Sequence, residues 1–177
     1  MSKKIAEFLA LGRGHTRSIA LDRDLHDEST VANYLVTPAA LGALRQIGVG
    51  IKTRQAQRAW KIVGPYGSGK SALGVMLAQL LSGKQAHPAA ARAIQKADSE
   101  VGSLFRTAKW FSLAIVGSRV SIGVALGNAI GTALKRVGKS KELSAFSKRL
   151  DRAARTYKGL PLNSIAGELA ADFAATI

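Results

Sequence analysis

The feature that most constrains this chain is the glycine-rich stretch "IVGPYGSGKSALG" at residues 62–74. Gly64, four further residues and then Gly69-Lys70-Ser71 give the G-x-x-x-x-G-K-[ST] spacing of a phosphate-binding loop. Glycines at these positions let successive backbone N–H groups turn inward around a phosphate, and a following helix points its positive end at the same place. The sequence therefore predicts a Walker A loop ahead of a helix.

The ligand expected at this loop is ATP with Mg²⁺. The Lys70 ammonium is expected to reach the β- and γ-phosphates as the catalytic contact, and the Ser71 hydroxyl to supply one ligand to Mg²⁺. The remaining contacts are expected from the backbone of the loop. The nucleotide-binding residues predicted in this way are Gly64, Pro65, Tyr66, Gly67, Ser68, Gly69, Lys70, Ser71 and Ala72.

The segments around the loop favour an α/β fold. Residues 60–63, Trp-Lys-Ile-Val, form a short apolar run that can end a buried strand, and residues 71–81 are helix-prone up to a stop at Ser82-Gly83. Residues 17–21 and 109–116 are further strand candidates. The expected fold class is a partial P-loop NTPase, a three-layer parallel sheet flanked by helices, with a helix-rich C-terminal part.

Several helices are expected from capping residues and from apolar periodicity. Thr37 as N-cap and Pro38 in the first turn predict a helix that runs to Ile47 and stops near Gly48. Further helices are expected over residues 88–107, 120–137, 140–157 and 163–176. The regions expected are a strand-helix lead-in at 1–58, a nucleotide-binding core at 59–137 and C-terminal helices at 138–177.

Residues 111–134 are mostly apolar and about as long as a membrane span, but a soluble interpretation is favoured. Arg119 lies inside this stretch, and an arginine at mid-bilayer costs roughly 2.5–3.5 kcal/mol. A strand followed by a glycine-faced helix accounts for the same residues, so no membrane partner is expected. Cysteine is absent, which removes disulfides and thiolate metal sites and fits a reducing cytoplasm.

The formal net charge of +15 favours an anionic partner. Such a basic chain attracts phosphate polymers such as DNA, and an acidic partner chain is the alternative. No base-reading motif accompanies the charge, so nucleic-acid contact would be directed at the backbone. His15, His26 and His87 lack the spacing of metal ligands and are expected at the surface.

A phosphate loop alone binds nucleotide without hydrolysing it. Hydrolysis needs an acidic residue at the end of a neighbouring strand to hold Mg²⁺ and orient water. None of the acids after the loop follows an apolar run of four β-type residues, so we expect little or no turnover by this chain alone. The alternative is a basic nucleic-acid-binding or assembly module with a vestigial loop. The acids concerned are Asp98, Glu100, Glu142, Asp151, Glu168 and Asp172.

Four segments in order carry a resemblance to a known group of proteins: "RSIALDRDLHD", "NYLVTPAALGALRQI", "RAWKIVGPYGSGKSALGVMLAQLLSG" and "FSLAIVGSR". Over residues 15–135 the chain resembles the N-terminal ATPase region of large bacterial P-loop proteins of BREX-type phage-defence and DNA-processing systems. The resemblance implies an AAA-like, ATP-binding core within a larger ATPase that acts with DNA, with other subunits or with further C-terminal domains. Members of that group carry the acidic strand, and this chain is expected to be the first part of a longer ATPase that stops before it.

The resemblance also draws attention to residues outside the loop. Tyr34 and Thr37 lie ahead of it, where similar ATPases often place adenine contacts, but helix capping explains Thr37 equally well. Arg119, at the end of a predicted strand, would face the nucleotide or lie in a solvated turn.

Overall fold

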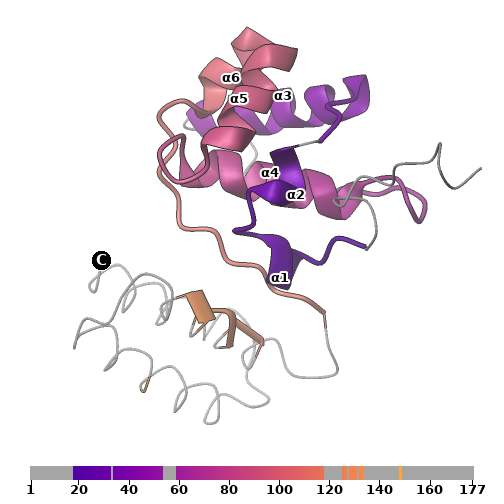
Figure 1. Ribbon diagram of the computed structural model, residues 1–177, viewed down its shortest axis with the longest axis vertical. Helices are drawn as coiled ribbons and strands as arrows, with labels where there is room; N and C mark the ends of the chain where they lie inside the picture. The colour runs from indigo at the N-terminus through magenta and orange to yellow at the C-terminus, as the bar shows by residue number, and fades with distance from the viewer. Residues whose placement is uncertain are drawn as a thin grey trace, which may run out of the picture. The chain divides into compact units, whose positions relative to one another are not determined.

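The computed structural model divides into two units, the boundary falling after Ser112. Each unit is described by itself (Figure 1). In the first unit all the regular elements of the described residues are helices. The residues described are 18–32, 34–53, 59–117, 125–126, 128–130, 132–133 and 148.

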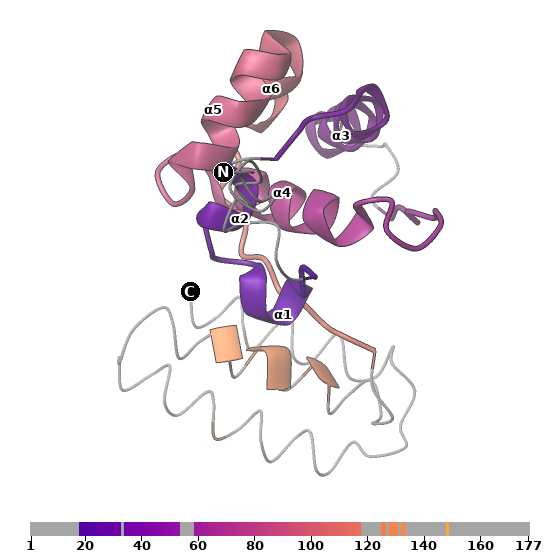
Figure 2. The same ribbon diagram turned by 45° about the vertical axis from the view of Figure 1, so that its right-hand side comes forward.

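The first unit is built around α4. In the views of Figures 1 and 2, α4 has α3, α5 and α6 on one side and α1 on the other, with α2 beside it. The helices are α1 (Leu21–Asp24), α2 (Ser29–Ala32), α3 (Pro38–Lys52), α4 (Lys70–Ser82), α5 (Pro88–Ala97) and α6 (Ser99–Phe105).

The core of this unit lies where these helices meet. Leu44 of α3, Met76 of α4 and Ile94 of α5 are almost fully buried in it. Because one apolar residue from each helix faces the same interior, burial of these side chains is the main stabilising contribution. The other buried members of the cluster are Val31, Ala40, Leu73, Val75, Leu80, Ala90, Val101 and Phe105.

Helix α3 begins as the sequence predicts and continues beyond the predicted end. The Thr37 hydroxyl accepts a hydrogen bond from the Ala40 amide at 3.2 Å, which confirms Thr37 as the N-cap. Gly48 does not end the helix, since α3 runs to Lys52. A Cβ at Gly48 would lie 2.8 Å from Leu104 Cβ, so glycine here allows α3 and α6 to approach closely.

The expected parallel sheet is wrong for the part of the chain that the structure describes. Residues 60–63 and 109–116 are neither helix nor strand, and Leu21, assigned to a strand, begins α1. Ile62 and Val63 are 41% and 76% exposed, whereas both would be buried in a parallel sheet covered on its two faces. The apolar face that α4 would place on a sheet is covered by helices instead.

The helix expected over residues 88–107 is divided in two. The break is at Asp98, whose carboxylate accepts a hydrogen bond from the Val101 amide at 3.0 Å and so caps α6. Asp is a strong N-cap residue, and this is the signal that the sequence interpretation missed.

Part of the second unit is described. Residues 125–126, 128–130 and 132–133 are helical, as expected for a helix over 120–137, and Ile130 and Ala133 are buried. Of the helix expected over 140–157 only Lys148 is described, and it is helical. The helix expected over 163–176 lies outside the described residues.

Candidate functional site

The backbone of the predicted phosphate loop takes a conformation that requires glycine. Gly67 and Gly69 have φ angles of 81° and 80°, in the left-handed region that residues with side chains rarely adopt. Gly69 is also the N-cap of α4, so the turn leads directly into the helix. The space beside both glycines is open, with no atom within 4 Å of a Cβ built there.

Lys70 is the first residue of α4, and its side chain folds back over the loop. Its Nζ donates hydrogen bonds to the carbonyl oxygens of Gly64 and Pro65, at 2.9 and 2.6 Å. The Ser68 hydroxyl lies 3.3 Å from the same nitrogen. The ammonium thus lies within the loop, on backbone oxygens.

The backbone donors at this end of α4 are free to take an anion. Among the described residues no hydrogen-bond acceptor is found for the amides of Gly69, Lys70 and Ser71. These are the orphan N–H groups of a helix N-terminus, where the helix dipole also favours negative charge. The residues present therefore fit a phosphate group.

The other predicted contacts differ in what they can offer. Tyr66 is fully exposed, and Pro65 and Ser71 are exposed as well. The Ala72 side chain is buried at 8% exposure, so only its backbone is available to a ligand. The Ser71 hydroxyl has the chemistry of a Mg²⁺ ligand, with oxygen as the donor.

The two acids described after the loop are engaged elsewhere in the fold. Asp98 and Glu100 pair instead with Arg45 of α3, at 2.7 and 2.9 Å. The capping bond from Val101, with Arg45 nearby, lowers the pKa of Asp98. The described residues also hold no group of three or more His, Cys, Asp or Glu that could bind a metal ion.

Thr37 and Tyr34, considered for adenine contact, have structural roles in the fold. The Thr37 hydroxyl caps α3, and Tyr34 is half-buried against the hydrophobic core, where burial raises the pKa of its phenol. The capping interpretation of Thr37 is therefore confirmed. Arg119 and His15 lie outside the described residues.

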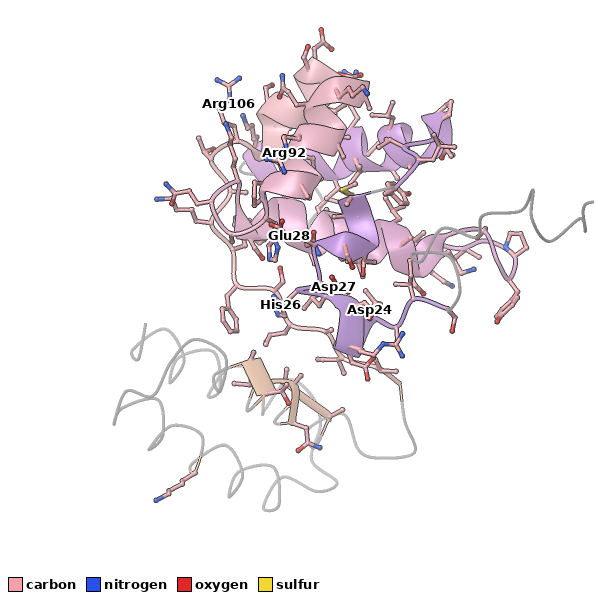
Figure 3. All side chains as sticks on the ribbon, in the orientation of Figure 1. Asp24, His26, Asp27, Glu28, Arg92 and Arg106 are labelled. Atoms are coloured by element: carbon pink, nitrogen blue, oxygen red, sulfur yellow. The ribbon has the colours of Figure 1, made fainter. Side chains whose placement is uncertain are left out.

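His87 is buried, and its expected place at the surface was wrong. It is 7% exposed, it directly precedes Pro88 of α5, and its ring stacks on that of His26 with centroids 5.9 Å apart. Burial lowers the pKa of His87, while Glu28, whose Oε1 lies 4.0 Å from Nδ1, acts in the opposite direction. Figure 3 labels His26 and Glu28 in this region. The burial of His87 depends on tertiary packing, which the local sequence pattern does not report.

Comparison of the chain with protein-family models, with curated proteins and with solved structures found no match. The resemblance to BREX-type ATPases accordingly stays a prediction. Within the described ranges, no helix has both the length and the apolar character needed to cross a bilayer.

Proposed function

We propose that the loop at residues 64–71 binds the phosphates of a nucleoside triphosphate, with ATP as the first candidate. The observation that carries the proposal is the position of Lys70. Its ammonium is hydrogen-bonded to the carbonyls of Gly64 and Pro65, so a positive charge lies in the middle of a loop that ends in free helix amides. Phosphate groups bind at helix N-termini for these same reasons.

Binding would proceed by exchange of hydrogen-bond partners at Lys70. Phosphate oxygens replace the two backbone carbonyls at Nζ, since a charged acceptor forms a stronger hydrogen bond than a neutral one. The amides of residues 69–71 hold the same phosphates from the helix side. Ser71 would hold a Mg²⁺ ion, which neutralises phosphate charge when it is bound.

Binding without turnover is the form of the activity that we propose for this chain alone. No acid after the loop follows a strand-like apolar run, so the residue that would orient a water molecule is missing from the sequence pattern. Action as part of a larger cytoplasmic ATPase, with DNA or with phage-defence components, is the wider proposal that follows from the resemblance.

The test is calorimetry of Mg²⁺-ATP binding to the wild type and to Lys70→Ala, with melting curves for both. We expect binding by the wild type and a loss of at least about tenfold in affinity on removal of the charge-assisted contact. Lys61→Ala is the matched control, because Lys61 is exposed just ahead of the loop, and it should change the affinity by less than about twofold. A folded wild type that binds no ATP would refute the proposal.

The second candidate, a basic nucleic-acid-binding module with a vestigial loop, is favoured by the net charge of +15. It predicts duplex DNA binding that weakens steeply with salt and is unchanged by ATP and by Lys70→Ala. DNA binding of this kind, together with no ATP binding, would select it over the nucleotide proposal.

A further inference from the structure

A cavity of about 400 Å³ opens at the far end of α4 from the phosphate loop. It lies between the end of α4, the turn after it, α5 and α6. A 13-residue helix is about 20 Å long, so this cavity is separate from the loop. Its volume is in the range of small-molecule sites. Its lining includes Gln79, Leu80, Lys84, His87, Arg92 and Arg106.

The charged side chains that line this cavity are all cationic, although Glu28 lies behind His87, its Oε1 4.0 Å from Nδ1. Lys84, Arg92 and Arg106 line it, and its lining contains no Asp or Glu. Figure 3 labels Arg92 on α5 and Arg106 just after α6. Within the described part of the chain none of these three cations has an ion-pair partner, whereas Arg45 and Arg23 are paired with carboxylates. Three unpaired cations around one cavity favour an anion, and arginine matches phosphate in particular.

Two buried polar atoms of the lining residues, one on Gln79 and one on His87, have no hydrogen bond. Gln79 is fully buried, and its Nε2 donates to the carbonyls of Leu25 and Asp27, at 3.2 and 3.0 Å. These two acceptors fix the amide orientation, which leaves Oε1 as an acceptor without a hydrogen bond. Nδ1 of His87 also has no hydrogen bond, with Glu28 at 4.0 Å. Both atoms are shielded from solvent, so they mark a polar region behind the cavity wall and are not contacts that a ligand in the cavity could reach.

The apolar side chains of the lining can contact the uncharged part of a ligand. Leu80, Ile94 and Phe105 form its inner side, and Ala91 lies beside Arg92 on α5. An apolar or aromatic body can lie against these side chains while the anionic group faces the cations.

We propose that this cavity is a second ligand site, which binds a small organic phosphate of nucleoside monophosphate size. The phosphate is held by Lys84, Arg92 and Arg106, and the ring system lies toward Leu80 and Phe105. The proposal does not depend on nucleotide binding at the phosphate loop.

The test is NMR titration of ¹⁵N-labelled full-length protein with AMP, with adenosine and inorganic phosphate as partial ligands. Glycine amides report on both sites, with Gly83 and Gly102 in the cavity and Gly67 and Gly69 in the loop. We expect AMP to shift the cavity glycines with a Kd of about 1 mM or tighter, and each partial ligand to bind more weakly. Shifts confined to the loop glycines, or no shifts in the cavity, would overturn the proposal.

Variants separate the cavity from general attraction to a basic surface. Arg92→Ala and Arg106→Ala should each weaken AMP binding by about tenfold, the loss of one charge-assisted contact. Lys96→Ala removes an exposed charge one turn further along α5, outside the cavity lining. This variant should change the affinity for AMP by less than about twofold. An equal effect of Lys96→Ala would overturn the proposal. Lys70→Ala should leave AMP binding at the cavity intact, so failure of either site is seen separately.

Discussion

At the residue scale, Gln79 joins two parts of the chain that are far apart in sequence. Its amide nitrogen holds the carbonyls of Leu25 and Asp27, which ties the turn between α1 and α2 to α4. A fully buried polar side chain in this position could not be identified from the sequence, because Gln79 lies in a helix-prone run where a solvent-facing position is the default. Hydrogen bonds between distant segments depend on packing that local patterns do not report.

Replacement of Gln79 by methionine tests this connection. The variant keeps a similar volume but removes the Gln79 donor from both carbonyls, which leaves Asp27 O with the Thr30 amide, so we expect a loss of about 1–3 kcal/mol in the free energy of unfolding. Urea denaturation measures it. Gln46→Met, at an exposed position of α3, should change the same quantity by less than about 0.5 kcal/mol. Equal stability of Gln79→Met and wild type would contradict the structural role.

His87 makes stability depend on pH. Its pKa is lowered in the folded protein from the ordinary 6.5, by burial against the opposing effect of Glu28, so the unfolded chain binds the proton more readily. Stability should therefore fall as the pH drops below about 6.5 and level off below the folded pKa.

The measurement is urea denaturation of wild type and His87→Gln at several pH values between about 7.5 and 5. The variant should lose most of the decline seen in wild type over this interval. His26 and Glu28 are present in both proteins, so their own titration contributes to both curves of stability against pH. An unchanged slope in the variant would show that His87 is not the group responsible.

At the scale of elements, helix ends that depend on capping residues were predicted correctly. Features that depend on contacts with distant segments were not. The start of α3 at Thr37-Pro38 and the end of α4 before Gly83 follow from capping chemistry alone. The strands assigned to residues 60–63 and 109–116 were wrong, because a short apolar run does not reveal whether a partner strand exists. Gly48 was taken for a stop, although its function is contact between α3 and α6.

Alanine substitutions at two glycines of α3 separate the effect of helix propensity on stability from the effect of packing. Gly48→Ala places a methyl group against Leu104 and Phe105, and we expect it to destabilise the fold by about 1–3 kcal/mol. Gly42→Ala on the same helix has nothing within 4 Å and should stabilise by about 0.5–1 kcal/mol, since alanine favours the helix. Thermal or urea unfolding of both variants measures the difference. Changes of the same sign would contradict the close approach of α3 and α6.

At the scale of the whole molecule, the sequence predicts the loop and its helix but not the scaffold around them. The G-x-x-x-x-G-K-[ST] spacing fixes local geometry through glycine conformations and a helix N-terminus, and these appear as expected at Gly67, Gly69 and Lys70. The parallel sheet was inferred only because this motif usually occurs in a P-loop NTPase fold. The cavity near Gln79 could not be predicted from a sequence motif, because its lining comes from α4, α5, α6 and the segments beside them.

The net charge of +15 predicts a stability that rises with ionic strength. Repulsion among the excess cations destabilises the compact state, and salt at about 0.15 M already reduces its range to about 8 Å. We expect the Tm to increase between low-salt buffer and about 0.3 M NaCl. Phosphate at equal ionic strength should raise it further if anions bind at specific sites, and calorimetric melting in the two salts makes the comparison. A Tm that falls with added NaCl would contradict the repulsion argument.

The stretch Trp110–Val116 has a consequence for handling the protein. Trp110, Phe111, Ile115 and Val116 are each 39–49% exposed, and no charge or proline interrupts the seven residues "WFSLAIV". Uncharged segments of this length and β-propensity are the ones that seed intermolecular sheet formation and amyloid-like aggregation. Protein concentration should therefore limit the shelf life of a purified sample, and a single gatekeeper charge such as Ile115→Lys should extend it.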